Sequence, residues 1–278
     1  MSADSENERS PDLVVDAQTR ETPSRPRLLL TNDDGIESPG LRLLAQRLAQ
    51  RHDVIVVAPD GDRSGSGTGI GRFDPHEGVA LVTADLEGVE AYAIAGPPGL
   101  AVMAGALGAF GKKPDLVVSG VNAGMNTGHS VLHSGTVGGA LTARTMGARG
   151  LAISVAASDP WQWETAVAVA ERIVPWMLRR PAGAVVLNVN VPALPFERLR
   201  GVTWAELDEF GYFRVATSDR TTSRLSFTVG ARDSGHDPEC DTARCLDGFV
   251  TLTPLSAIGH HPVAFAADEV CNLARSPD

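Results

Sequence analysis

The sequence predicts an α/β protein with a Rossmann-like, doubly wound and mostly parallel sheet, extended toward the C-terminus by antiparallel β structure. Two observations predict this fold class. Up to about residue 195, short runs rich in Val, Ile and Leu alternate with amphipathic or small-residue stretches, which is the pattern of βαβ units around a sheet buried on both faces. Beyond that point, strand-like stretches follow one another without a strong helical pattern between them, which favours antiparallel pairing.

The first βαβ unit shows the pattern most clearly. RLLLTN, from Arg27, is a short apolar run that ends in turn residues, and DVIVVAP, from Asp53, is a second run rich in β-branched residues. Between them, Ser38 and Pro39 supply an N-cap and a first-turn proline for a helix over GLRLLAQRLAQ. This order predicts two parallel strands joined by a helix.

The same alternation continues along the chain and supports a doubly wound sheet. We expect further strands over residues 79–83, 89–94, 114–120, 151–156 and 184–192, and helices over residues 98–110, 135–147 and 160–179, the last opened by Asp159 and Pro160. The later strand-like stretches are GVTWAEL, GYFRVA, RLSFTVG and GFVTLTPL.

Three parts of the chain follow from this pattern. Residues 1–26 are polar and acidic without a sustained period, which indicates a disordered leader. Residues 27–195 are predicted to form an α/β core. Residues 196–278 form a β-rich extension and tail that we expect to serve in oligomer contacts.

Composition and charge exclude several classes of function. No apolar run approaches the roughly 18 residues that a membrane span needs, and the N-terminus lacks the basic and then apolar order of a secretory signal, so we expect a cytoplasmic protein. A formal net charge of −10 argues against binding a nucleic-acid polymer, which requires a basic face. It does not exclude a small anionic substrate, because a bound cation reverses the potential locally.

The cysteines do not predict a disulfide or a zinc site. Cys240, Cys245 and Cys271 make an odd number in a long chain, which favours reduced thiols. Cys240 and Cys245 lack the two-residue spacing of a zinc knuckle, and there is no second cysteine pair.

Three polar loops that follow apolar runs carry the functional signal. They are TNDDG (residues 31–35), DGDRSG (residues 60–65) and GVNAG (residues 120–124). In open parallel sheets, ligands bind beyond the carboxyl ends of the strands, near the point where the strand order reverses. We therefore expect the three loops to open on one edge of the sheet.

Within these loops, Asp33 and Asp34 are adjacent carboxylates, which repel and are costly to bury unless a cation or hydrogen bonds offset the charge. A hard divalent ion such as Mg²⁺ or Mn²⁺ suits a set of carboxylate, amide and hydroxyl oxygens, and Ser64 and Asn122 would add neutral oxygens. Taken singly, each of the four residues is explained as well by an Asx-turn, a cap or a loop hydroxyl. Their combination predicts a metal site.

The segment Ser134, Gly135 and Thr136 precedes a predicted helix. A helix N-terminus with small residues and free backbone N–H groups binds anions, and the two hydroxyls would add donors to a phosphate. An ordinary Ser/Thr N-cap is the alternative, and both interpretations can hold together. His129 and His133, just before this segment, are either substrate partners or solvated loop residues.

The glycine-rich stretch GSGTGIG (residues 65–71) does not predict a dinucleotide site. Its order is not G-x-G-x-x-G, it follows the second strand instead of the first, and no clear amphipathic helix comes after it. We expect these glycines to let the backbone approach the metal site closely.

Together these motifs resemble the SurE (survival protein E) family of nucleotidases. The resemblance covers residues 27–256 and rests on LLLTNDDGIESPGL, VVAPDGDRSGSG, VVSGVNAGMNTG, HSGTVGGAL and DGFVTLTPL, in this order. It implies a metal-dependent phosphatase that acts on nucleoside 5′- and 3′-monophosphates, with short polyphosphate as a substrate of some members. It also implies one divalent ion, Mg²⁺ or Mn²⁺, per subunit, and homodimers or homotetramers formed by exchange of the C-terminal extension.

The resemblance makes the α/β core of residues 27–195 a metal-binding phosphatase core and places the metal ligands on Asp33, Asp34, Ser64 and Asn122. We expect Asp33, Asp34 and Asn122 to carry catalysis as well. Substrate or phosphate binding is assigned to Asn32, Asn126, Ser134, Gly135 and Thr136. The chain departs from the family pattern at the substrate rim, at Thr68-Gly69, at Ser130 and His133, and at residues 96–98.

The expected reaction is hydrolysis of the phosphate ester by a metal-activated water, without a covalent enzyme intermediate. Whichever of Asp33 and Asp34 binds the metal less tightly would orient that water or accept its proton, and the helix terminus with Ser134 and Thr136 would stabilise the equatorial oxygens. One alternative is a broad-specificity phosphatase or exopolyphosphatase. Another is a non-catalytic nucleotide-binding sensor.

Overall fold

The computed structural model describes residues 25–183, 185–232 and 235–256. Its large sheet contains β1 (Arg27–Thr31), β2 (Asp53–Pro59), β3 (Leu81–Thr83), β4 (Glu90–Ile94), β5 (Leu116–Ala123), β6 (Arg149–Val155), β7 (Val186–Val191), β8 (Gly201–Trp204) and β11 (Phe249–Leu255). A separate hairpin consists of β9 (Phe213–Arg220) and β10 (Leu225–Ala231). The helices are α1 (Pro39–Ala49), α2 (Pro98–Ala106), α3 (Gly135–Thr145), α4 (Trp163–Leu178) and α5 (Asp241–Leu246), with short 3₁₀ turns η1 (Gly128–Leu132) and η2 (Phe196–Arg198).

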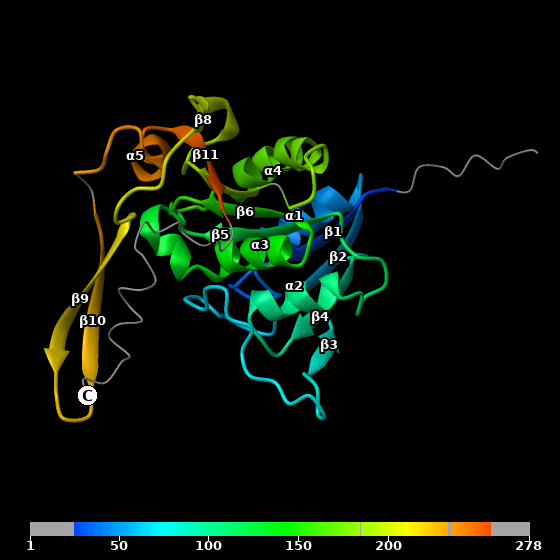
Figure 1. Cartoon of the computed structure of the whole chain (residues 1–278). Coiled ribbons are helices and arrows are strands. Elements are labelled where there is room, and N and C mark those ends of the chain that lie inside the picture. The colour runs from blue at the N-terminus through cyan, green and yellow to red at the C-terminus, as the bar shows by residue number, and fades with distance from the viewer. Residues whose placement is uncertain (1–24, 184, 233–234, 257–278) are drawn as a thin grey trace, which may run out of the picture.

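The nine strands of the large sheet lie in the order β3-β4-β2-β1-β5-β6-β7-β11-β8 (Figure 1). Pairing is parallel from β4 to β7, and it is antiparallel at β3–β4 and at β7–β11. The predicted α/β class with a mostly parallel sheet is thus confirmed. From β1, the chain adds β2 and β4 on one side and later β5, β6 and β7 on the other, so the strand order reverses between β1 and β5.

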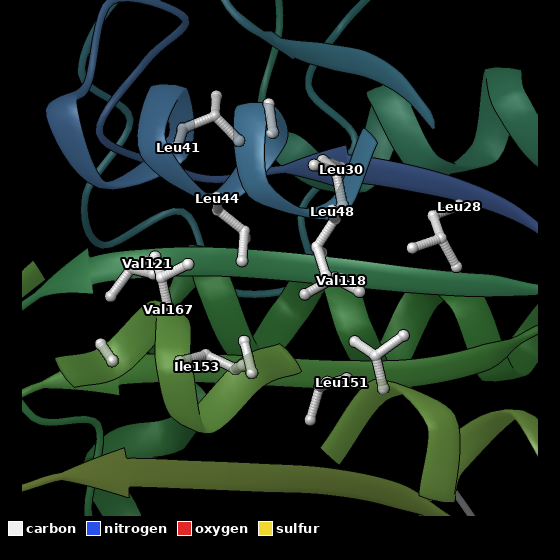
Figure 2. Packing of buried hydrophobic residues seen from close by; sticks show 14 of the residues in the cluster. Leu28, Leu30, Leu41, Leu44, Leu48, Val118, Val121, Leu151, Ile153 and Val167 are labelled. Atoms are coloured by element: carbon white, nitrogen blue, oxygen red, sulfur yellow. The ribbon is translucent and has the colours of Figure 1, made fainter. Parts of the chain in front are cut away.

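Helices cover both faces of this sheet. Leu28 and Leu30 of β1 point to the face covered by α1 and α4, where they pack in one cluster with Leu41, Leu44 and Val167 (Figure 2). Leu29, between them, belongs to the opposite cluster together with residues of α2 such as Val102. Because alternate side chains of a strand point to opposite faces, the continuous apolar runs of the sequence are explained by burial on both sides.

The structure confirms the predicted start of α1 but not that of α4. Ser38 is the N-cap residue of α1 and Pro39 its first residue, as predicted, although the Ser38 side chain makes no capping hydrogen bond. The prediction that α4 opens at Asp159 and Pro160 is wrong, because the helix begins at Trp163. The Pro160 carbonyl accepts hydrogen bonds from the Ser158 hydroxyl (3.0 Å) and from the Gln162 side chain (3.3 Å), so local side-chain bonds replace the first helical turn.

The later part of the chain is not a purely antiparallel addition. β11 inserts between β7 and β8, antiparallel to β7 but parallel to β8, and so widens the large sheet. The helix α5 was not predicted, because six residues are too few for a helical period to show in the sequence. The hairpin β9–β10 projects away from the body of the protein (Figure 1). The domain boundary at residue 195 stays a prediction.

Residues 1–24 of the predicted leader and residues 257–278 of the tail, with Cys271, lie outside the described residues. No helix in the part that the structure describes is both long enough and apolar enough to cross a membrane.

Candidate active site

The three polar loops lie where the topology predicts a ligand site. Asp33 and Asp34 follow β1, Ser64 lies in the loop after β2, and Asn122 stands near the end of β5. Since β1, β2 and β5 are parallel neighbours and the strand order reverses between β1 and β5, their carboxyl ends lie at the position where open α/β sheets bind ligands.

Asp33 is buried at the start of α3, with 3% of its surface exposed. Its Oδ1 atom accepts a hydrogen bond from the Thr136 hydroxyl. Burial raises the pKa of Asp33, and hydrogen bonds from the Thr136 side chain and from backbone N–H groups, including those of Thr136 and Gly135, oppose this increase. The first turn of α3 therefore faces a carboxylate of the chain itself.

Close contact between α3 and Asp33 requires a glycine at position 135. A Cβ atom on Gly135 would lie 2.7 Å from Asp33 Cβ and 2.8 Å from Asp33 Oδ2. These separations are shorter than any normal contact, so a larger residue would displace the carboxylate.

Asp34 is a carboxylate without a compensating charge. Burial, followed by the negative charges of Asp33 and Asp62, raises its pKa to about 6, against an opposing hydrogen bond from the Ala123 backbone. Its Oδ2 atom is buried and has no hydrogen-bond partner. Among the residues that the structure describes, no Lys, Arg or His forms an ion pair with Asp33 or Asp34.

Asn122 is oriented by its own strand end. Its Nδ2 atom donates to the Gly124 carbonyl (2.7 Å), and its Oδ1 atom lies 3.2 Å from the Thr136 hydroxyl that also contacts Asp33. The register of β5 against β6 shifts between Ser119 and Asn122, which is a β-bulge or a similar irregularity of the strand. Bulges redirect side chains at sheet edges, so this irregularity accounts for the position of the Asn122 carbonyl oxygen beside Asp33.

Ser64 lies in an exposed loop that is fastened to Asp33. The Arg63 backbone N–H donates to the Asp33 carbonyl (2.7 Å), and the Arg63 side chain pairs with Asp60. The Ser64 hydroxyl donates to Asp62 Oδ1 (2.6 Å), which leaves the lone pairs of its oxygen for another partner. The hydrogen bonds from Ser64 lower the pKa of Asp62.

Asp62 is a feature that sequence reasoning missed. It orients Ser64 through both the hydroxyl and the backbone N–H (2.8 Å) and adds negative charge next to Asp34. The signal was present, because an Asp two residues before a Ser is typical of an Asx-turn that accepts the backbone N–H of that residue.

The glycine-rich loop lies against the start of α3. A Cβ atom on Gly138 would come within 1.9 Å of the Gly67 carbonyl oxygen, and the Gly67 N–H donates to the His133 carbonyl (3.1 Å). Backbone thus packs directly on backbone next to Asp33, as the glycines of this loop predict.

The predicted substrate residues are already engaged within the protein. Asn32 exchanges two hydrogen bonds with Gly35 (3.0 and 3.1 Å), and the Asn126 side chain donates to Ser154 (2.9 Å). The Ser134 hydroxyl accepts from the Val137 N–H (3.1 Å) as the N-cap of α3. Their roles in substrate binding, like that of Thr136, stay predictions.

The two loop histidines are exposed, and His129 faces another region. It lines a cavity of about 390 Å³ together with Asp208 and Cys240. The structure therefore brings together Asp33, Asp34, Asn122 and Thr136, with Ser64 in the adjoining loop, and does not add His129 to this group.

Comparison with known proteins gives a consistent result. The profile of the family described as Survival protein SurE matches residues 28–213. The 5′-nucleotidase SurE of Nitrosococcus oceani is 36% identical over 82% of this chain and 90% of its own length. The 5′/3′-nucleotidase SurE of Serratia proteamaculans is 32% identical over 88% of this chain and 94% of its own length.

A solved structure agrees with these sequence matches. The crystal structure of the SurE protein from Aquifex aeolicus superposes with a TM-score of 0.70 at 31% identity, covering 83% of this chain and 93% of that one. With a family profile that spans most of the described core and relatives above 30% identity over most of their length, the conclusion is direct: this chain belongs to the SurE family.

Proposed function

We propose that this protein hydrolyses the phosphate ester of nucleoside 5′- and 3′-monophosphates with the help of a divalent metal ion. The observation that carries the proposal is the pair of adjacent carboxylates, Asp33 and Asp34, at the topological switch point without a cationic partner among the described residues. The nucleotidase names of the related proteins supply the substrate class.

The residues at the switch point fit such an ion. The buried and unpartnered Asp34 Oδ2, the Asp33 carboxylate, the Asn122 carbonyl oxygen and the Ser64 hydroxyl oxygen form a set of hard oxygen donors. When bound there, one Mg²⁺ or Mn²⁺ would polarise a phosphoryl oxygen and lower the pKa of a water molecule. The ligand preferences of the two ions do not separate them.

The chain's own residues position the reacting groups. Thr136 holds Asp33 in place through its hydroxyl, so Asp33 is the more constrained of the two carboxylates. Asp34 lacks such a side-chain donor, and we assign it the task of orienting the attacking water and accepting its proton.

A phosphate group would lie at the first turn of α3. Ser134 accepts a hydrogen bond through its oxygen, so its own proton is not used in that bond and can be donated to a phosphoryl oxygen. The backbone N–H groups at this helix terminus favour negative charge on the equatorial oxygens. Asn32 and Asn126 would support the site indirectly, by holding the conformation of the loops.

We further propose that the protein assembles into homodimers or homotetramers through the region after residue 195. The hairpin β9–β10 projects from the body and exposes Val215, Phe227 and Val229, each by more than half of its surface. An isolated two-stranded hairpin is marginal by itself, and exposed apolar patches favour association with another chain. A cytoplasmic location is proposed on the sequence grounds given above.

The test is phosphate release from a panel of nucleoside 5′- and 3′-monophosphates, p-nitrophenyl phosphate and polyphosphate. We expect activity that EDTA abolishes and that Mg²⁺ or Mn²⁺ restores, with nucleotides as the preferred substrates. The Asp34→Asn variant should be inactive, whereas Glu37→Gln, an exposed carboxylate in the same loop, should keep its activity.

Each of the other outcomes has a clear meaning. Full activity in EDTA, or in Asp34→Asn, would overturn the proposal. Equal rates on p-nitrophenyl phosphate, polyphosphate and nucleotides would favour a broad-specificity phosphatase or exopolyphosphatase. Tight nucleotide binding with no phosphate release over hours would favour a sensor.

A further inference from the structure

A second group of metal-binding side chains lies outside the candidate active site. It consists of Asp208, His236 and Cys240, and one ligand atom of each lies within 4.8 Å of the others. Asp208 and Cys240 are each 3% exposed, and the His236 side chain is 5% exposed. Asp208 precedes β9, His236 follows β10, and Cys240 is the N-cap residue of α5, so three separate elements converge here.

The orientation of His236 suits a ligand. Its Nε2 atom lies 2.7 Å from the Arg232 carbonyl oxygen, which only accepts hydrogen bonds, so Nε2 carries a proton. The other nitrogen, Nδ1, is directed at Asp208 Oδ2 at 2.7 Å. A histidine that donates one ring N–H to a backbone carbonyl and presents the other nitrogen to the site has the arrangement usual for metal-binding histidines.

The remaining donors match the same class of ion. Cys240 Sγ accepts a hydrogen bond from the Ala243 N–H (3.4 Å), an ordinary distance for a sulfur acceptor. Burial is the main cause that raises the pKa of Cys240, and the charge of Asp208 adds to it. An imidazole nitrogen, a thiol sulfur and a carboxylate oxygen at one buried place are the ligand types of zinc and related borderline ions, and bound metal deprotonates the thiol.

We propose that Asp208, His236 and Cys240 bind a divalent transition-metal ion of the zinc class. Tetrahedral bonds of the usual lengths place the ligand atoms about 3.3–3.5 Å apart. The site therefore needs Asp208 and His236 to separate by roughly 0.6 Å from their present 2.7 Å, a shift within reach of side-chain rotation. The adjoining cavity, which Glu206 and Glu239 help to line, has room for a water molecule as fourth ligand.

The position of this site indicates a structural task. Asp241, next to Cys240, accepts hydrogen bonds from the Gly128 N–H (3.1 and 3.2 Å to its two oxygens) and from the Asp208 N–H (3.0 Å). Gly128 begins the η1 turn, which leads directly into the segment at Ser134. An ion at Cys240 would thus fasten the region after residue 195 to the loop that enters the candidate active site.

Neither the family resemblance nor cysteine spacing points to this site. His236 and Cys240 lie beyond the residues that the family profile matches. Cys245, the other cysteine of α5, is buried among apolar residues such as Met125 and Ala156 and belongs to no such group in the described chain, so it serves as a matched control.

The experiment titrates the full-length, reduced and metal-free protein with Co²⁺. A thiolate ligand gives a sulfur-to-cobalt charge-transfer band in the near ultraviolet, whereas the oxygen donors of the candidate active site give none. We expect the band to saturate at one equivalent per chain and to disappear when Zn²⁺ is added. Cys240→Ser should abolish the band, and Cys245→Ala and Cys271→Ser should retain it.

A second variant keeps the test decisive if Cys240→Ser does not fold. His236→Gln, with its folding checked by circular dichroism, should weaken Co²⁺ binding at least about tenfold. No band in the folded, reduced wild-type protein would mean a buried Asp208–His236 ion pair without metal and would overturn the proposal. A band that persists in folded Cys240→Ser would overturn it as well.

Discussion

Replacing Asp34 with asparagine should stabilise the metal-free protein while it abolishes activity. The neutral amide keeps the shape of the carboxyl group but removes the repulsion with Asp33 and Asp62 and the cost of burying a charge. If the site has evolved to hold a cation, its residues are destabilising in the absence of that cation.

The magnitude follows from the pKa of Asp34. The fold raises this pKa from 3.8 to about 6, and one pKa unit corresponds to about 1.4 kcal/mol, so the ionised carboxylate costs at most about 3 kcal/mol. Screening by solvent at this partly exposed group reduces the expected gain to about 2 kcal/mol. For a chain of this size that gain raises Tm by roughly 4–8 °C.

The sign of the pH dependence is fixed by the direction of the shift. A raised pKa means that the stability contributed by protonated Asp34 is complete below pH 3.8 and is lost as pH rises through about 6. The asparagine variant has no such loss. Its advantage over the wild type should therefore be small near pH 4 and reach its full size above pH 7.

The assay is thermal or urea unfolding of both proteins in EDTA at pH 4 and pH 8, with Glu37→Gln as the control for removing an exposed charge from the same loop. Addition of Mg²⁺ or Mn²⁺ at pH 8 should raise the Tm of the wild type more than that of Asp34→Asn. Two results would refute this account of the site: an Asp34→Asn variant that is no more stable than the wild type at pH 8, or a gain in stability that is the same at pH 4 and pH 8.

Three further substitutions test the packing around the site and the fold. Thr136→Val removes the hydroxyl that holds Asp33 and should lower activity about 10–100-fold while unfolding stays cooperative; an unchanged rate of phosphate release would contradict this role. Gly138→Ala places a methyl group 1.9 Å from the Gly67 carbonyl and should cost about 1–3 kcal/mol, which urea unfolding measures; an unchanged midpoint would contradict the close approach. Arg27→Met removes an almost buried cation that bonds a carboxylate and a backbone carbonyl, and should cost about 1–3 kcal/mol in the same assay without changing substrate preference.

The fold places the residues proposed as metal ligands at one point for a topological reason. β1 and β5 are neighbours in the sheet, yet 88 residues of sequence separate their paired positions, such as Leu28 and Leu116 or Thr31 and Ser119. Because strands distant in sequence pair at the switch point, two carboxylates from one loop and an amide from another meet there.

Much of this arrangement could be predicted from the sequence. The apolar runs are local patterns that reflect burial on both faces of a sheet, so the parallel strands β1, β2 and β5 and the loops after them follow from the sequence alone. The proposed chemistry of Asp33 and Asp34 follows less directly, because a turn also explains this dipeptide and only the other polar loops on the same sheet edge favour a metal site.

Other features depend on contacts that no local pattern records. The sequence does not reveal that the side-chain amides of Asn32 and Asn126 donate hydrogen bonds to Gly35 and Ser154. An asparagine in a loop looks the same in the sequence whether its hydrogen-bond partner is a ligand or the protein. Nor does the sequence reveal that β11 enters the large sheet between β7 and β8, since strand order depends on pairing between segments that are distant in the sequence.

The sequence thus indicated Asp33 and Asp34 as candidate metal ligands, and the tertiary structure decided their surroundings. Thr136, which was predicted to face a phosphate, donates its hydroxyl to Asp33. Asp208 and His236 stand 28 residues apart and meet only because the chain turns back through a hairpin between them. Residue type and spacing report local chemistry, whereas the meeting of distant side chains depends on the packing of the whole chain.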